Sequence, residues 1–152
     1  TAAIFAMLLF MPTLALHAAD SGTAYEQPVL GGYSPVSYYE QGHPERGSRD
    51  YRSSYQGNLY WFTDKAQKRT FDANPAAYAP IFPRHCPYNL ATGRQVGVDP
   101  TNFKIVDGQL LLFHRSAEQD GRKRWEETIT HSNITEKELL RRAESNLFKL
   151  NF

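Results

Sequence analysis

One thiol and two imidazoles are the side chains of this chain that are best suited to do chemistry. Cys86 is the single cysteine among 152 residues, His85 precedes it directly, and His114 follows a predicted strand. Thiolate and imidazole together suit copper first and zinc second. Two histidines and one cysteine would be enough for a trigonal or an open tetrahedral site. The sequence therefore predicts a soft transition-metal site made of Cys86, His85 and His114, used for binding or trafficking of the ion.

A lone thiol has other uses, and these stay open. Free cysteines are most often small buried hydrophobic residues, and one cysteine cannot form an internal disulfide. Cys86 could also be redox-active or bridge to another chain, and Arg84 with a protonated His85 would lower its pKa if both lie nearby. A metal ligand must be accessible and close to a histidine nitrogen. A buried or isolated thiol, together with an exposed aromatic patch elsewhere, instead indicates a non-metal structural or protein-interaction module.

Catalysis has weaker support. Cys86 and His114 can be combined with Asp99 or Asp107 as a nucleophile and base, but the local sequence matches no cysteine-peptidase signature. The chain has no Gly-rich phosphate loop, His-Glu-x-x-His motif or paired-carboxylate pattern. We therefore expect a binding protein rather than an enzyme, and we assign no catalytic and no cofactor-binding residue.

The residues before Cys86 are expected to position the thiol. The aromatic run Leu59–Phe62 predicts a strand. Asp64 and Gln67 have the spacing of a capping box, which predicts the start of a helix. Pro75 predicts that this helix ends there or that a second helix begins. Prolines on both sides of Cys86 predict that it lies in a loop, where functional residues are common.

The order of these motifs resembles the YHS domain family. The resemblance is carried by Gly57-x-x-Tyr60-x-Phe62-Thr63, then Phe71, then Asn74-Pro75-x-x-Tyr78-x-Pro80, after an opening segment Gly32–Tyr39 similar to Asp-Pro-Val-x-Tyr. It covers roughly residues 31 to 129. It is similar above all to small exported bacterial proteins with a single YHS domain, which implies a fold and a compartment more than a defined activity.

Two departures from the family pattern concern the metal hypothesis. Metal-associated YHS domains carry cysteines near the opening motif and just before the helix, where this chain has Ser34–Tyr38 and Thr63–Ala66. The later Cys86 matches the exported relatives. Those relatives usually have Gly-Gly-aromatic before the cysteine, whereas this chain has Pro83-Arg84-His85.

Two predicted hairpins define the fold class. Alternating polarity or an apolar run marks each strand, and the strands are expected at Asp50–Tyr55, Leu59–Phe62, Asn102–Val106 and Gln109–Phe113. Asp107-Gly108 suits the type I′ turn of the second hairpin. Capping boxes at Ser116/Gln119 and Thr135/Glu138 predict two C-terminal helices. The predicted fold is α+β, with a small antiparallel sheet built from two hairpins, helices packed on it, and C-terminal helices.

Charge and the first residues indicate the compartment. Seventeen Lys and Arg against 16 Asp and Glu give a net charge of +1, so nothing calls for nucleic acid or an anionic membrane. The apolar run Ala2–Leu16, which ends in small alanines, predicts a partial signal peptide over 1–19. An extended leader over 20–32 and one YHS-like domain with a C-terminal helical extension over 33–152 would follow. We expect a periplasmic or secreted protein, with a metal ion or an envelope protein as partner and a homodimer as an open alternative.

Aromatic residues give a third hypothesis. The chain has nine Tyr and nine Phe, more than one small core must bury. Some of them would line a pocket or a partner surface. The alternative is that they cover the sheet with their hydroxyls in water, and the set in question is Tyr33, Tyr38, Tyr39, Tyr51, Tyr55, Tyr60 and Trp61.

Overall fold

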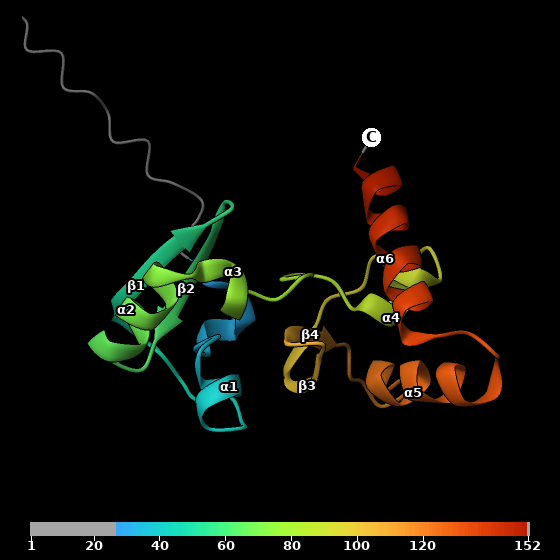
Figure 1. The fold of residues 1–152 in the computed structure, drawn as a ribbon, viewed down its shortest axis with the longest axis horizontal. Coiled ribbons are helices and arrows are strands. Elements are labelled where there is room, and N and C mark those ends of the chain that lie inside the picture. The colour runs from blue at the N-terminus through green and yellow to red at the C-terminus, as the bar shows by residue number, and fades with distance from the viewer. Residues whose placement is uncertain (1–26, 152) are drawn as a thin grey trace, which may run out of the picture.

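A computed structural model of the chain describes residues 27–151 (Figure 1). The predicted signal peptide and most of the predicted leader lie outside these residues. The chain folds as an α+β protein with two antiparallel hairpins and helices packed on them, which confirms the predicted fold class. Each hairpin forms its own two-stranded sheet, whereas the sequence predicted one small sheet built from both.

The first hairpin and its helices form the N-terminal half. Its elements are η1 (Val29–Gly32), α1 (Ser37–Glu40), β1 (Ser48–Tyr55), β2 (Asn58–Phe62), α2 (Lys65–Ala73) and α3 (Pro75–Tyr78). Val29 and Leu30 are buried in the core, so the end of the predicted leader belongs to the folded part. Side chains of β1 alternate between half-buried and exposed from Tyr51 to Tyr55, as predicted for a strand with one wet face.

The helix that follows the first hairpin begins as the sequence predicted. The Asp64 carboxylate accepts a hydrogen bond from the Gln67 amide at 2.8 Å and caps α2. The Gln67 side chain is buried, and its Oε1 accepts a hydrogen bond from the Ser34 hydroxyl at 2.6 Å instead of closing a capping box on Asp64. Pro75 is the first residue of α3, where its missing N–H is not needed.

The second hairpin and three helices form the C-terminal half. The elements are α4 (Pro87–Ala91), β3 (Asp99–Val106), β4 (Gln109–Phe113), α5 (Gly121–His131) and α6 (Glu136–Leu150). Asp107 and Gly108 both have positive φ, 48° and 77°, as the predicted type I′ turn requires. In Figure 1 the N-terminal elements lie on the left, α4–α6 lie on the right, and the second hairpin lies between them.

Strand β4 contributes to two hydrophobic cores. Its four apolar residues are all 0% exposed, and side chains alternate between the two faces of a strand. Leu110 and Leu112 belong to the core of the N-terminal elements. Leu111 and Phe113 belong to a second core, which contains Trp125 of α5. The hairpin is therefore a shared layer that joins the two halves.

The C-terminal half differs from the sequence prediction at the start of α5. Before it, Pro87 starts the five-residue helix α4 directly after Cys86. The helix predicted from Ser116 begins later, because Asp120 accepts hydrogen bonds from two amides and is the true cap of α5. Ser116 instead accepts hydrogen bonds from the amides of Glu118 and Gln119 within a turn. The helix predicted after Thr135 is confirmed as α6.

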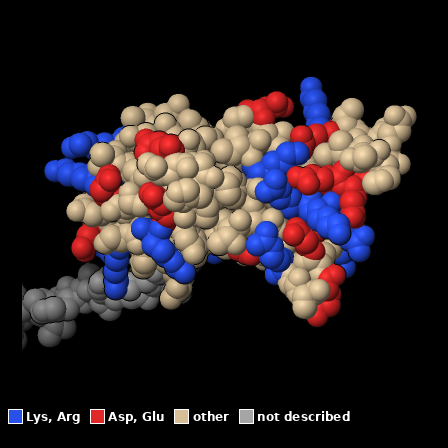
Figure 2. All heavy atoms as spheres, turned by 90° about the horizontal axis from the view of Figure 1, so that it is seen from below, with Lys and Arg blue, Asp and Glu red and all other residues tan. Residues whose placement is uncertain are grey.

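The surface carries charges of both signs. Figure 2 shows Lys, Arg, Asp and Glu side chains interspersed over the C-terminal half of the face in view. Among residues 27–151, no helix has both the length and the apolar character needed to cross a bilayer.

Candidate functional site around Cys86

The main chain of Cys86 is held on both sides. Cys86 is the N-cap residue of α4, and Pro87 is the first residue of that helix. Its amide donates a hydrogen bond to the Val96 carbonyl at 2.8 Å, and its carbonyl accepts one from the Leu90 amide at 2.9 Å. The loop predicted from the flanking prolines is therefore short and fixed, and it leads directly into a helix.

The thiol lies inside the second core. Cys86 is 0% exposed and packs in the same cluster as Phe82, Leu90 and Trp125. A β-carbon built on Gly121, the first residue of α5, would lie only 2.7 Å from the Cys86 Sγ. The sulfur thus fills the space against the α5 backbone that a side chain at position 121 would need. In this arrangement solvent does not reach the thiol.

His85 is half-buried beside the exposed Arg84. Burial first, and the positive charge of Arg84 second, lower the pKa of His85 below its ordinary value. The protonated His85 that would activate the thiol is therefore disfavoured. Arg84 itself donates a hydrogen bond from Nε to the Asn58 Oδ1 at 3.2 Å, which ties this segment to β2.

The main chain of His114, rather than its ring, lies near the Cys86 thiol. Its carbonyl accepts hydrogen bonds from the Gly121 amide at 2.8 Å and from the Asn102 Nδ2 at 3.1 Å. The same Gly121 α-carbon packs against the Cys86 sulfur, so the structure brings the segments of Cys86 and His114 together. The His114 ring makes a different contact, because its Nδ1 lies 3.2 Å from the Gly97 carbonyl oxygen.

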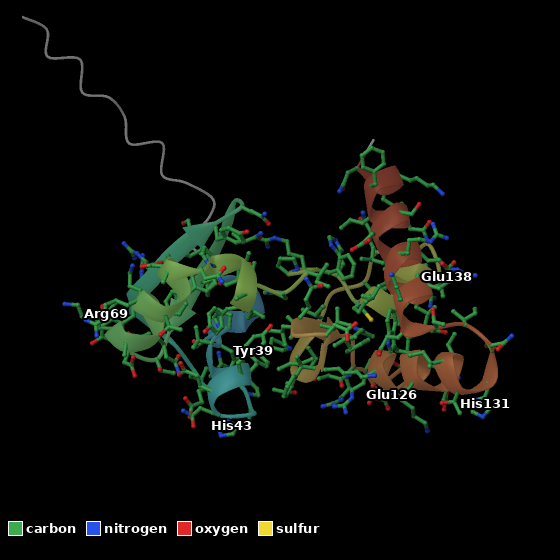
Figure 3. All side chains as sticks on the ribbon, in the orientation of Figure 1. Tyr39, His43, Arg69, Glu126, His131 and Glu138 are labelled. Carbon is green, nitrogen blue, oxygen red and sulfur yellow. The ribbon has the colours of Figure 1, made fainter. Side chains whose placement is uncertain are left out.

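The other histidines of residues 27–151, and the two aspartates considered as partners of His114, lie apart from this place. Figure 3 shows His43 beside α1 and His131 at the end of α5, both at the surface and far from each other. Asp99 lies 3.6 Å from Arg115 in an ion pair, and Asp107 occupies the turn at the other end of the hairpin from His114. These contacts place neither aspartate against the His114 ring. The nucleophile and base pair considered from the sequence therefore lacks a carboxylate to orient its imidazole.

The side chains around Cys86 do not fit a metal ion in this arrangement. A structural zinc site needs four ligands, and a catalytic one needs three from the protein. Within residues 27–151, no three His, Cys, Asp or Glu side chains are grouped so that they could hold an ion. The thiol is enclosed by apolar side chains, and the His114 ring points to a carbonyl. We therefore derive no chemical step through a metal.

Sequence reasoning missed a buried amide at this place. Asn102 is 1% exposed, and its Nδ2 donates hydrogen bonds to the Asp120 carboxylate at 2.9 Å and to the His114 carbonyl. The bond from Asn102 is the main reason why the pKa of Asp120 lies below its ordinary value. The Asn102 Oδ1 is buried and has no hydrogen-bond partner within residues 27–151. An asparagine inside a predicted strand was the available signal, because strands disfavour this residue.

The aromatic cluster is used mainly in packing. Tyr38 and Tyr60 are buried, and burial raises the pKa of both phenols. The Tyr38 hydroxyl donates to the Pro100 carbonyl at 2.8 Å, and the Tyr39 hydroxyl donates to the Gly108 carbonyl at 3.2 Å. These bonds attach the second hairpin to α1. The remaining members are half-buried, and they are Tyr33, Tyr51, Tyr55 and Trp61.

No protein-family model, no curated protein and no solved structure matches the chain.

Proposed function

We propose that the chain is a structural or protein-interaction module of the cell envelope, in which Cys86 is a core residue rather than a metal ligand. The observation that carries this proposal is the burial of the thiol, which is 0% exposed and packed against the α5 backbone at Gly121. A free cysteine in such surroundings behaves as a small hydrophobic residue.

The compartment and the family belong to the same proposal. The apolar run Ala2–Leu16 supports export to the periplasm or the outside of the cell. A YHS-like relationship is supported by the ordered motifs quoted above, and by the succession of β2, a capped α2 and a helix that starts at Pro75. The sequence offers a thiol next to an imidazole but no recognisable catalytic motif, so we prefer a binding role to catalysis.

Metal binding is the second candidate, and one observation favours it. The lowered pKa of His85 favours a neutral imidazole at the residue next to Cys86 in the chain, which is the protonation state that a metal ligand needs. Binding of copper or zinc by Cys86, His85 and His114 would require the Cys86 segment to leave its place against Gly121. On this hypothesis the apo protein opens before it binds.

Thiol accessibility tests the first candidate. The reaction of purified protein with a thiol reagent such as Ellman's reagent is followed with and without denaturant. The reference is an exposed thiol in the same fold, Ser54→Cys in a Cys86→Ala background, because Ser54 lies on the exposed face of β1. We expect native Cys86 to react at least about a hundredfold more slowly than the thiol introduced at position 54, since a core thiol reacts only after opening. Equal rates would contradict a core role.

Metal titration separates the two candidates. Copper(I) and zinc are titrated under reducing conditions into the wild type and into Cys86→Ser. We expect neither protein to bind either ion more tightly than a competing chelator of micromolar affinity. Stoichiometric binding that Cys86→Ser loses would establish the metal role instead, and His85→Ala and His114→Ala would then identify the remaining ligands.

A further inference from the structure

Helix α6 has one face in the core and another face turned to solvent. Leu139 and Ala143 are buried against the second core, and the Asn146 Nδ2 donates a hydrogen bond to the Leu90 carbonyl of α4 at 2.8 Å. Beside this core-facing side runs a shallow groove, which is lined by Thr135, Lys137, Glu138, Leu140, Arg141 and Glu144. Leu140 lies at the boundary, since it is half-buried and also packs against the second core. Lys137, Leu140 and Glu144 are spaced by three and four residues, so they form one stripe along the helix.

The same stripe ends in an exposed aromatic ring. Phe148 lies four residues beyond Glu144 and is 66% exposed, the highest exposure among the large hydrophobic residues of 27–151. Leu150 of the same turn is 45% exposed. In Figure 1 this end of α6 rises well above α4 and α5. A projecting apolar turn and a groove thus lie about two helical turns apart on one helix.

Two charges on the stripe have no ion-pair partner within the part of the chain that the structure describes. Glu138 binds both Arg141 and Arg142, at 2.9 and 3.0 Å. Lys137 and Glu144 are exposed and form no ion pair there. They have opposite sign and lie on either side of Leu140, three residues before it and four after it.

From this pattern we infer that α6 is the interface of a homodimer, in which the α6 helices of two copies pack antiparallel across a twofold axis that passes between Leu140 and Arg141. A twofold axis pairs each residue with the one equally far on the other side of the axis. Lys137 of each copy then faces Glu144 of the other, and the ion pair forms twice. The stripe is therefore complementary to itself only in the antiparallel direction.

The apolar contacts fit the same register. Leu140 meets its own counterpart beside the axis. Helical side chains lean toward the N-terminus of their helix, so Phe148 reaches over the Thr135 end of the groove on the second copy. Each copy thus provides one projecting ring and one groove, and in the dimer each ring contacts the groove of the other copy. A closed pair results, rather than a chain of copies.

The contact is small, so the dimer is weak. A helix of 15 residues is about 22 Å long, and one helix pair lies at the low end of specific interfaces. We expect a monomer–dimer equilibrium that depends on concentration and becomes weaker in high salt, since two exposed ion pairs contribute to it. This inference does not depend on the role of Cys86.

A charge swap tests the interface. Sedimentation velocity over a wide concentration range measures the dimer dissociation constant of the wild type, Lys137→Glu, Glu144→Lys and the double variant. Each single reversal replaces two attractions by two repulsions and should raise the dissociation constant about tenfold or more. The double variant restores opposite charges between the copies, so its constant should return to within a few-fold of the wild type. Lys123→Glu on α5 is the control and should change nothing.

A crosslink tests the register independently. In a Cys86→Ala background, Leu140→Cys places one thiol per copy beside the proposed axis, and mild oxidation should give a disulfide-linked dimer. The control Lys123→Cys should give much less of it. A wild type that stays monomeric at every concentration would overturn the inference. A double variant as weak as the single reversals, or no preferred crosslink through position 140, would overturn the antiparallel register.

Discussion

The contact between Cys86 and Gly121 explains why a glycine, a poor helix former, stands at the start of a helix. Glycine in a helix is less favourable than alanine by about 1 kcal/mol, so Gly121 weakens the predicted helix. In the structure Gly121 is the first residue of α5, and an added β-carbon would lie 2.7 Å from the Cys86 Sγ and 3.2 Å from the His114 carbonyl oxygen. The sulfur at position 86 and the missing side chain at position 121 therefore depend on each other sterically.

Gly121→Ala should lower the free energy of unfolding by about 1–3 kcal/mol, because it overpacks this place. Cys86→Ala removes the sulfur, and the double variant should be more stable than the sum of the single effects by roughly 1 kcal/mol. The rescue is partial, since the His114 main chain stays close. Gly97→Ala is the matched control, because nothing lies within 4 Å of its added β-carbon. Strict additivity in urea unfolding would show that sulfur and helix are not in contact.

His85 gives the unfolding free energy a pH dependence with a definite sign. Burial and Arg84 lower its pKa in the folded protein, so the unfolded chain binds the proton more tightly. The stabilisation is complete above the ordinary pKa of 6.5 and is lost as the pH falls through 6.5 toward the lower folded pKa. His85→Gln should therefore lose less stability than the wild type between neutral and mildly acidic pH. Parallel curves for His85→Gln and wild type would contradict this assignment.

Substitutions at the start of α5 test whether Asp120 or Ser116 caps the helix. Asp120 accepts hydrogen bonds from the amides of Arg122 and Lys123 and from the buried Asn102 side chain. Asp120→Ala should cost about 1–2 kcal/mol of unfolding free energy, and Asp120→Asn should cost clearly less, since asparagine also caps well. Ser116→Ala should cost less than Asp120→Ala, because Ser116 belongs to a turn before the helix. Thermal unfolding of the three variants gives the ranking, and a larger effect at Ser116 would restore the capping box read from the sequence.

Local signals were sufficient for the hairpins and for most of the caps. The Asp107-Gly108 turn and the caps at Asp64 and Thr135 act over a few residues, so their spacing determines the structure. The start of α5 was placed at Ser116 because Ser116 and Gln119 have the spacing of a capping box, although the amides of Arg122 and Lys123 donate to Asp120 instead. The burial of Cys86 could not be read from its own neighbourhood in the sequence, since α5 covers it from a place 35 residues further along the chain.

The molecule as a whole depends on the second hairpin, because β4 supplies adjacent leucines to different cores. Leu110 packs with the N-terminal elements and Leu111 packs with α4–α6, and both are fully buried. The apolar run in the sequence predicted a buried strand but did not show which elements would cover its two faces. Unfolding either core exposes one face of the same strand. We therefore expect the two halves to unfold together.

The two tryptophans provide one probe in each half. Trp61 lies on β2, and Trp125 lies on α5 in the second core. Trp125→Phe leaves Trp61 as the reporter of the N-terminal half, and Trp61→Phe leaves Trp125 as the reporter of the other. Leu111→Val faces only the second core and should cost about 1 kcal/mol. When it is added to each single-tryptophan chain, the urea midpoint should fall by the same amount with either reporter, because a shared layer couples the cores. A shift seen by Trp125 alone would instead mean that the halves unfold separately and that β4 holds them together without making them one cooperative unit.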